Sequence, residues 1–173
     1  YETEYLISLF QKKGYEIMSF EDECDIYVVN TCTVTNQSDA KSRKIINQVK
    51  KKNPNAILVA CGCYIESQNR KNETFKDIDI IVGNNKKSQI VEFVEEYIKT
   101  NKTISVVDNK NLSNMPFEDM MLDHFEGKTR AFVKIEEGCT EFCSYCIIPY
   151  SRGRVRSKPI DELENELCAL SDA

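Results

Sequence analysis

Short, mainly apolar runs alternate with helix-like segments along the first hundred residues. The apolar runs lie at 26–29, 56–60 and 78–82. Apolar runs of this length are typical of strands that are buried on both faces of a sheet. Segments with helical periodicity or helix-start signals lie at 2–13, 38–53, 65–75 and 88–99, and Ser38 and Asp39 are predicted to cap the second of them. The alternation predicts an α/β fold, an open parallel sheet with helices on both faces, over residues 1–100.

Two cysteines follow the ends of the first two predicted strands. Cys32 comes three residues after the first apolar run, and Cys63 three residues after the second. Ligands of open parallel sheets bind just beyond the carboxyl ends of the strands, so we expect both thiols at one edge. The chain begins without a methionine and inside a predicted helix. We therefore expect a piece of a longer protein, whose missing first strand would deliver another loop to this edge.

A second domain is predicted to begin after a linker. Residues 101–128 lack periodicity, particularly at Asn109–Asn114 and Met115–Pro116, and are interpreted as a linker or lid. From residue 129 onward, alternation at 131–135 predicts a strand, and an apolar stripe after Pro159 predicts a final helix. Because a closed α/β barrel needs roughly 200 residues or more, we expect residues 129–173 to be only the beginning of one.

Composition narrows the class of protein. No apolar run approaches the roughly 18 residues that cross a membrane, and the first residues do not resemble a secretory signal. Eight cysteines in such a chain indicate metal or redox chemistry in a reducing, cytoplasmic compartment rather than disulfides. The net charge of −5 argues against nucleic-acid binding along the whole chain and leaves room only for local basic patches.

Cys139, Cys143 and Cys146 form a C-x3-C-x2-C run in the loop after the predicted strand at 131–135. Three thiolates this close favour a soft metal centre. A 4Fe-4S cluster with only three protein ligands would leave one iron open to a bidentate small molecule. The alternative is a structural zinc site with Cys168 or His124 as the fourth ligand. Neither has a zinc-finger spacing, and Cys168, beside the apolar stripe of the last helix, is predicted to be in the core.

Other cysteines and cations receive simpler interpretations. Cys61 closes the second apolar run and is predicted to be core, with a redox or substitute-ligand role as the alternative. Cys24 lies among acidic residues and lacks the cationic neighbours of reactive cysteines, so no chemistry is assigned to it. Four cations follow the triad and could meet a phosphate or carboxylate, although a solvated loop would look the same: Arg152, Arg154, Arg156 and Lys158. A second basic group is interpreted as solvated helix surface: Lys41, Arg43, Lys44 and Lys50–Lys52.

Several motifs resemble the radical S-adenosylmethionine methylthiotransferases. The cysteine triad, with the segment Ile147–Ser157 that follows it, resembles the radical loop of that family. Segments 30–35 and 62–64 resemble two of the three cysteine motifs of its N-terminal domain, and Tyr1-Glu2-Thr3 resembles the residues after the first motif's cysteine. Within the family, the Thr-Val-Thr after Cys32 most resembles enzymes that methylthiolate threonylcarbamoyladenosine next to the tRNA anticodon.

The resemblance implies two 4Fe-4S clusters with different tasks. The cluster held by Cys139, Cys143 and Cys146 would bind S-adenosylmethionine and cleave it to a radical that abstracts hydrogen from adenine C2. The auxiliary cluster held by Cys32, Cys63 and a missing cysteine would carry the sulfur, which a second S-adenosylmethionine methylates. The residues expected to contact the cofactor are Tyr145, Arg152 and Arg154.

The same resemblance implies partners and leaves alternatives open. The implied partners are the tRNA anticodon stem-loop and an electron donor such as flavodoxin. The fragment alone is expected to be inactive. Alternatives are an enzyme that acts on isopentenyladenosine in tRNA or on a ribosomal-protein side chain, and a non-catalytic metal-binding module.

Overall fold

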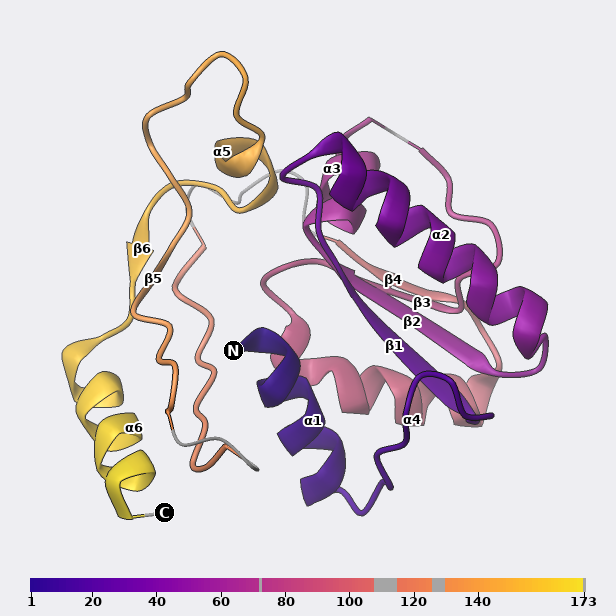
Figure 1. Cartoon of the computed structure of the whole chain (residues 1–173), viewed down its shortest axis with the longest axis horizontal. Coiled ribbons are helices and arrows are strands. Elements are labelled where there is room, and N and C mark those ends of the chain that lie inside the picture. The colour runs from indigo at the N-terminus through magenta and orange to yellow at the C-terminus, as the bar shows by residue number, and fades with distance from the viewer. Residues whose placement is uncertain (72, 108–114, 126–129, 173) are drawn as a thin grey trace.

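The computed structural model describes residues 1–71, 73–107, 115–125 and 130–172, which form two packed parts (Figure 1). The first part contains α1 (Glu2–Lys12), β1 (Ile26–Thr31), α2 (Asn36–Lys52), β2 (Ile57–Gly62), α3 (Cys63–Arg70), β3 (Ile80–Val82), the 3₁₀ helix η1 (Lys87–Gln89), α4 (Ile90–Thr100) and β4 (Ile104–Val106). The second part contains β5 (Glu136–Glu137), α5 (Ile148–Ser151), β6 (Arg156–Ser157) and α6 (Ile160–Asp172).

The first part is a parallel sheet in the order β1-β2-β3-β4 with helices on both faces (Figure 1). Leu58 and Ala60 of β2 belong to one buried cluster, with Ile46 of α2. The alternate β2 residues Val59 and Cys61 belong to a second cluster, on the face covered by α1 and α4. Because β2 is buried on both faces, its sequence is continuously apolar. The predicted α/β fold is confirmed.

Helix α2 begins at a capping residue that differs from the one predicted. Thr35 is the N-cap, and its hydroxyl accepts a hydrogen bond from the Ser38 amide at 3.1 Å. The sequence analysis assigned this role to Ser38 and Asp39. Thr35 takes it because its extended backbone turns the hydroxyl toward the first helical amides, whereas Asp39 accepts a hydrogen bond from Thr33.

Two strand assignments differ from the sequence analysis. Residues 104–106, within the predicted linker, form β4 and pair in parallel with β3. The predicted strand at 131–135 is absent. Phe132 and Ile135 are 65% and 58% exposed, so burial of these apolar side chains does not stabilise a strand here. The two-residue strand β5 follows instead and pairs antiparallel with β6. The predicted features at 109–114 and at residue 129 lie outside the described residues.

The final helix is confirmed, but its apolar stripe is not its buried side. In α6, Ile160 and Leu167 are 74% and 49% exposed, and the fully buried side chain is Glu166. Glu166 accepts a hydrogen bond from Lys158 at 2.6 Å and another from the Leu122 amide at 3.1 Å. The helix is therefore attached to the preceding segment by buried polar contacts. Among the described residues, no helix is both long and apolar enough to cross a membrane.

Candidate functional site

The carboxyl edge of the sheet brings Cys32 and Cys63 to neighbouring positions. Strands β1 and β2 pair up to Thr31 and Gly62, and the two cysteines are the next residues of each chain segment. Gly62 has φ +100°, and a Cβ there would lie 2.4 Å from the Thr31 carbonyl oxygen. Only glycine therefore allows this close turn from β2 into α3. The predicted shared edge is confirmed, with Cys32 exposed and Cys63 buried.

The second part of the chain packs against this edge at Cys63. Asn84, just after β3, donates from Nδ2 to the Ser151 carbonyl oxygen at 2.7 Å and lies 3.8 Å from Cys63 Sγ. Arg152 follows directly. Burial alone would lower the pKa of its guanidinium, but Glu2, and to a smaller extent Cys63, raise it. The segment after the cysteine triad thus meets a predicted cluster ligand of the sheet.

The triad occupies the loop between β5 and α5. Cys143 is exposed, Cys139 and Cys146 are half-buried, and all three thiols are free. The Cys146 amide donates to the Cys143 carbonyl oxygen at 2.9 Å, and the Cys139 amide to that of Gly153 at 3.0 Å. Three free thiols in one loop are the donor type of a thiolate-bound cluster. Within the described ranges, however, no three histidine, cysteine or carboxylate side chains converge as metal ligands.

Arg70 of α3 holds the segment that follows the triad. Its Nη1 donates to the Tyr150 carbonyl oxygen at 2.8 Å, and its guanidinium lies 5.4 Å from the centre of the Tyr150 ring. Phe142 of the triad loop packs edge-on against the same ring at 5.9 Å. By contrast, Tyr145 is 91% exposed, and Arg154 is also exposed. The helix that starts at Cys63 is therefore tied through Tyr150 to the triad loop.

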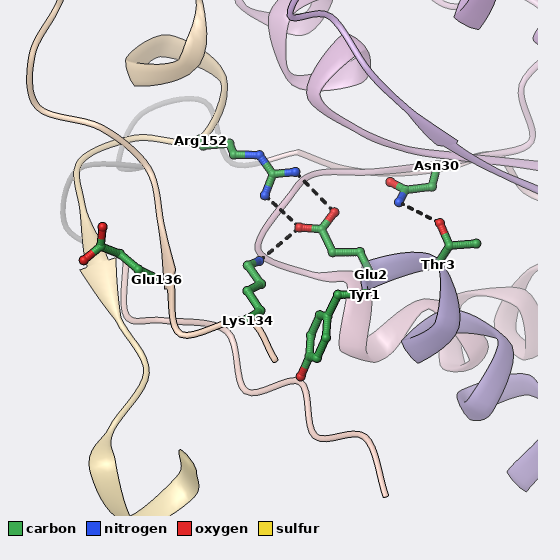
Figure 2. A pocket seen from close by; sticks show the side chains of 7 residues that line it. All are labelled: Tyr1, Glu2, Thr3, Asn30, Lys134, Glu136 and Arg152. Atoms are coloured by element: carbon green, nitrogen blue, oxygen red, sulfur yellow. Dashed lines mark hydrogen bonds and ion pairs between the residues drawn. The ribbon is translucent and has the colours of Figure 1, made fainter. Parts of the chain in front are cut away.

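A cleft of about 420 Å³ lies between the two parts, with Glu2 of α1 in its wall (Figure 2). Arg152 and Lys134 point toward the Glu2 carboxylate, at 2.7 Å and 3.0 Å, while Glu136 points away. Lys87, fully buried behind the cleft, lies 2.5 Å from the same carboxylate. Burial alone would raise the Glu2 pKa, but these three cations hold it well below its usual range. Glu2 is therefore a permanent anion at neutral pH.

Glu137 is the second carboxylate of this ionic cluster. It lies 2.5 Å from Lys134, 2.6 Å from Arg156 and 3.5 Å from Arg152. Arg152, predicted to contact a cofactor, is thus fixed by two carboxylates. Sequence reasoning singled out Arg152 and Arg156 but missed the cluster, because Glu2 is far from its partners along the chain and the other pairs form no periodic pattern. The resemblance at Tyr1-Glu2-Thr3 was the one available indication of a role for Glu2.

The remaining cysteines and the histidine differ in burial and in their contacts. Cys61 is fully buried, which raises the pKa of its thiol to about 11, and its predicted core position is confirmed. Cys168 is exposed, so its predicted core position is wrong. It lies on the outer side of α6, whereas Glu166 faces inward. His124 Nδ1 lies 2.7 Å from Asp123 Oδ1, and Cys24 is half-buried.

Comparison with known proteins gives the class to which this fold and cysteine pattern belong. The model of "Uncharacterized protein family UPF0004" matches residues 1–83. The chain is 41% identical to "Threonylcarbamoyladenosine tRNA methylthiotransferase MtaB" of Aquifex aeolicus, over 99% of the chain and 42% of that relative. It is 36% identical to the Bacillus subtilis protein of the same name, over 100% of the chain and 38% of the relative.

A third relative is named for a different substrate. The "tRNA-2-methylthio-N(6)-dimethylallyladenosine synthase" of Methylacidiphilum infernorum is 31% identical over 99% of the chain and 38% of the relative. The chain is thus similar along nearly its whole length to tRNA methylthiotransferases, and its first 83 residues match one family model. It spans about two fifths of the length of the relatives named for threonylcarbamoyladenosine.

Proposed function

We propose that this chain is part of a tRNA methylthiotransferase that inserts a methylthio group at C2 of threonylcarbamoyladenosine next to the anticodon. Three relatives named for this substrate are 41%, 36% and 35% identical to the chain and a fourth 29%, against 31% and 30% for relatives named for dimethylallyladenosine. This difference supports the threonylcarbamoyl substrate over isopentenyladenosine. The similarity to methylthiotransferases along the whole chain supports transferase chemistry over a non-catalytic metal module.

The observation that carries the proposal is the meeting of the two cysteine regions. Asn84 contacts both Cys63 Sγ and the Ser151 carbonyl oxygen, and Arg70 joins α3 to Tyr150. The sheet edge with Cys32 and Cys63 is therefore packed against the segment that follows the triad. A transfer of sulfur from one metal centre to a substrate activated at another requires such proximity.

The cysteines divide into two proposed ligand sets. Cys139, Cys143 and Cys146 would hold one 4Fe-4S cluster, while Cys32 and Cys63 would contribute to an auxiliary one. When bound, the first would supply reductive cleavage of S-adenosylmethionine, with an electron donor such as flavodoxin, and the second would supply sulfur. The exposed Tyr145 and Arg154 remain accessible to the cofactor or the tRNA. Arg152 would act by holding the loop against Glu2.

We assign the reaction to the cytoplasm.

Anaerobic reconstitution with iron and sulfide tests the ligand sets. We expect the reduced chain to give a 4Fe-4S electron paramagnetic resonance signal that shifts when S-adenosylmethionine is added. Cys143→Ala should abolish the shift, because it removes an exposed ligand of the open-iron cluster. Cys168→Ala is the matched control: it also removes an exposed thiol, but one outside both ligand sets, and the signal should be unchanged.

A zinc-binding module predicts a different result. If the chain bound one equivalent of zinc and gave no cluster signal, and if Cys168→Ala lost that zinc, the radical proposal would be refuted and the structural alternative supported. For the parent enzyme, mass spectrometry of digested tRNA gives the substrate. A methylthio group on dimethylallyladenosine instead of threonylcarbamoyladenosine would contradict the assigned substrate and retain the reaction class.

A further inference from the structure

Helix α2 has a strongly basic surface within an acidic chain. Its 17 residues contain six basic side chains and one acidic side chain, Asp39. The whole chain carries −5, so the net +5 of α2 leaves −10 on all other residues together. A concentration of positive charge on one element of an acidic molecule is typical of a surface that binds a polyanion.

Three of these lysines form one stripe along the helix. Lys41, Lys44 and Lys51 are exposed and follow one another at intervals of three and seven residues, which places them on one side of α2. None of the three has an ion pair with an acidic side chain of the described residues. Lys50, by contrast, pairs with Asp79 at 2.6 Å. The stripe therefore has three positive charges available for a partner.

A groove of about 350 Å³ runs beside the stripe. Its lining comprises Ile46, Asn47, Lys50, Lys51 and Asp77. Ile46 is buried, whereas Asn47 and Lys51 are exposed. Lysine and asparagine side chains are common partners of phosphate and sugar oxygens. Asn47 and Lys51 are therefore the groups of the groove that suit a nucleic-acid backbone, whereas the exposed Asp77 carboxylate repels phosphate and Lys50 is already paired.

The stripe begins near the candidate site. Helix α2 starts at Asn36, four residues after Cys32, and its 17 residues extend over about 26 Å. It covers the face of the sheet opposite α1 and α4 (Figure 1). A polyanion bound along α2 would therefore have one end near the strand edge, where Cys32 and Cys63 lie, and would extend from there along the outside of the molecule.

We propose that the stripe of Lys41, Lys44 and Lys51 binds the phosphate backbone of the substrate RNA beside the nucleotide that is modified. The inference rests on the proposed function, which makes tRNA the substrate. Lysine contacts with phosphates release counterions, so they give affinity that is independent of base sequence and sensitive to salt. The stripe would orient the RNA, and base recognition would lie at the strand edge.

Fluorescence anisotropy with a labelled, unmodified anticodon stem-loop RNA tests this surface across a series of salt concentrations. Log affinity falls with log salt, and this fall should be less steep in the variant Lys41→Gln/Lys44→Gln/Lys51→Gln. We expect the magnitude of the slope to decrease by about 2–3, the value for three lost phosphate contacts. The matched control Lys13→Gln/Lys99→Gln/Lys102→Gln removes the same charge from exposed positions at the α1 and α4 side. Its slope should stay at the wild-type value.

Three results would overturn the inference: no RNA binding by the wild-type chain, equal slopes for the stripe variant and wild type, or equal losses in the two triple variants. Equally salt-dependent binding of polyglutamate through the same lysines would assign the surface to an acidic protein instead. The reconstituted cluster signal is measured on the same preparations. If the stripe variant kept both the cluster signal and wild-type RNA binding, only the proposed RNA-binding surface would be refuted. If the wild-type chain bound RNA through the stripe but formed no cluster, only the proposed function would be refuted.

Discussion

At the scale of single residues, Cys61 and Cys63 show how position on a strand decides the role of a thiol. They are two residues apart, yet Cys61 lies in the cluster packed under α1 and α4, whereas Cys63 begins α3 at the sheet edge. Burial raises the pKa of Cys61 to about 11. Its thiol is therefore protonated at neutral pH and is a poor metal ligand or nucleophile.

This difference predicts the order of alkylation in the native chain. At pH 8, a pKa of about 11 leaves roughly one Cys61 in a thousand as thiolate, and the side chain is also fully buried. We expect iodoacetamide to modify the exposed Cys143 at least about a hundredfold faster than Cys61, measured by peptide mass spectrometry over time. In guanidinium chloride the two rates should converge. Equal rates in the native chain would contradict the buried position.

The sequence identified the cysteines of the site but not the charges that surround them. Cys32 and Cys63 could be placed at one edge because the strand pattern fixes where parallel strands end. The partners of Glu2 could not be predicted, since Lys87 is 85 positions away in the first part, and Lys134 and Arg152 lie in the second. Glu137 was not singled out either, because its ion pairs at mixed spacings form no periodic pattern. Cys168 was misplaced because its helix buries Glu166 instead of its apolar stripe.

At the scale of elements, a fully buried ion pair attaches α6 to the rest of the chain. Lys158, after β6, and Glu166 are both 0% exposed at their side chains and lie 2.6 Å apart. Lys158 Nζ also donates to the Met120 carbonyl oxygen at 3.0 Å. Removing one partner leaves a buried charge without its counter-charge, which costs about 3–5 kcal/mol.

A double-mutant cycle measures this attachment. Lys158→Met and Glu166→Gln should each be strongly destabilising, and we expect the double variant to recover about 2 kcal/mol relative to their sum. Urea unfolding gives the free energies. The exposed pair Lys12 and Asp123, at 2.8 Å, is the control, and its coupling should be below about 1 kcal/mol because solvent screens it. Similar couplings for both pairs would show that burial does not strengthen the α6 contact.

Elements with strong patterns were predicted better than short ones. The three apolar runs form β1, β2 and β3. Helices cover these strands, and an apolar run predicts a strand correctly where it is buried in this way. Strand β4 was missed because three residues at a sheet edge, Ile104–Val106, carry too little periodicity. The segment 131–135 has the alternation of a strand but no sheet to join, so the pattern alone was misleading.

At the scale of the whole molecule, Glu2 joins the two parts through opposite charges. It belongs to α1 of the first part and binds Lys87 there, while Lys134 and Arg152 come from the second part. The two parts therefore meet through a carboxylate that must remain ionised. Because its folded pKa is depressed below the usual value of about 4.3, Glu2 stabilises the fold fully above about pH 5.5. This contribution is lost progressively as the pH falls below that usual value.

The variant Glu2→Gln isolates this contribution. At pH 7 we expect it to lower the free energy of unfolding by about 3 kcal/mol, since three cations lose their shared carboxylate. Because the glutamine does not titrate, the loss of stability between pH 6 and pH 4 should be shallower than in the wild type. Urea titrations over this range measure both effects, and Glu16→Gln, at an exposed position, should reproduce the wild-type slope. A variant with the wild-type pH profile would mean that the two parts are held together by other contacts, and that the ionic cluster follows their packing instead of stabilising it.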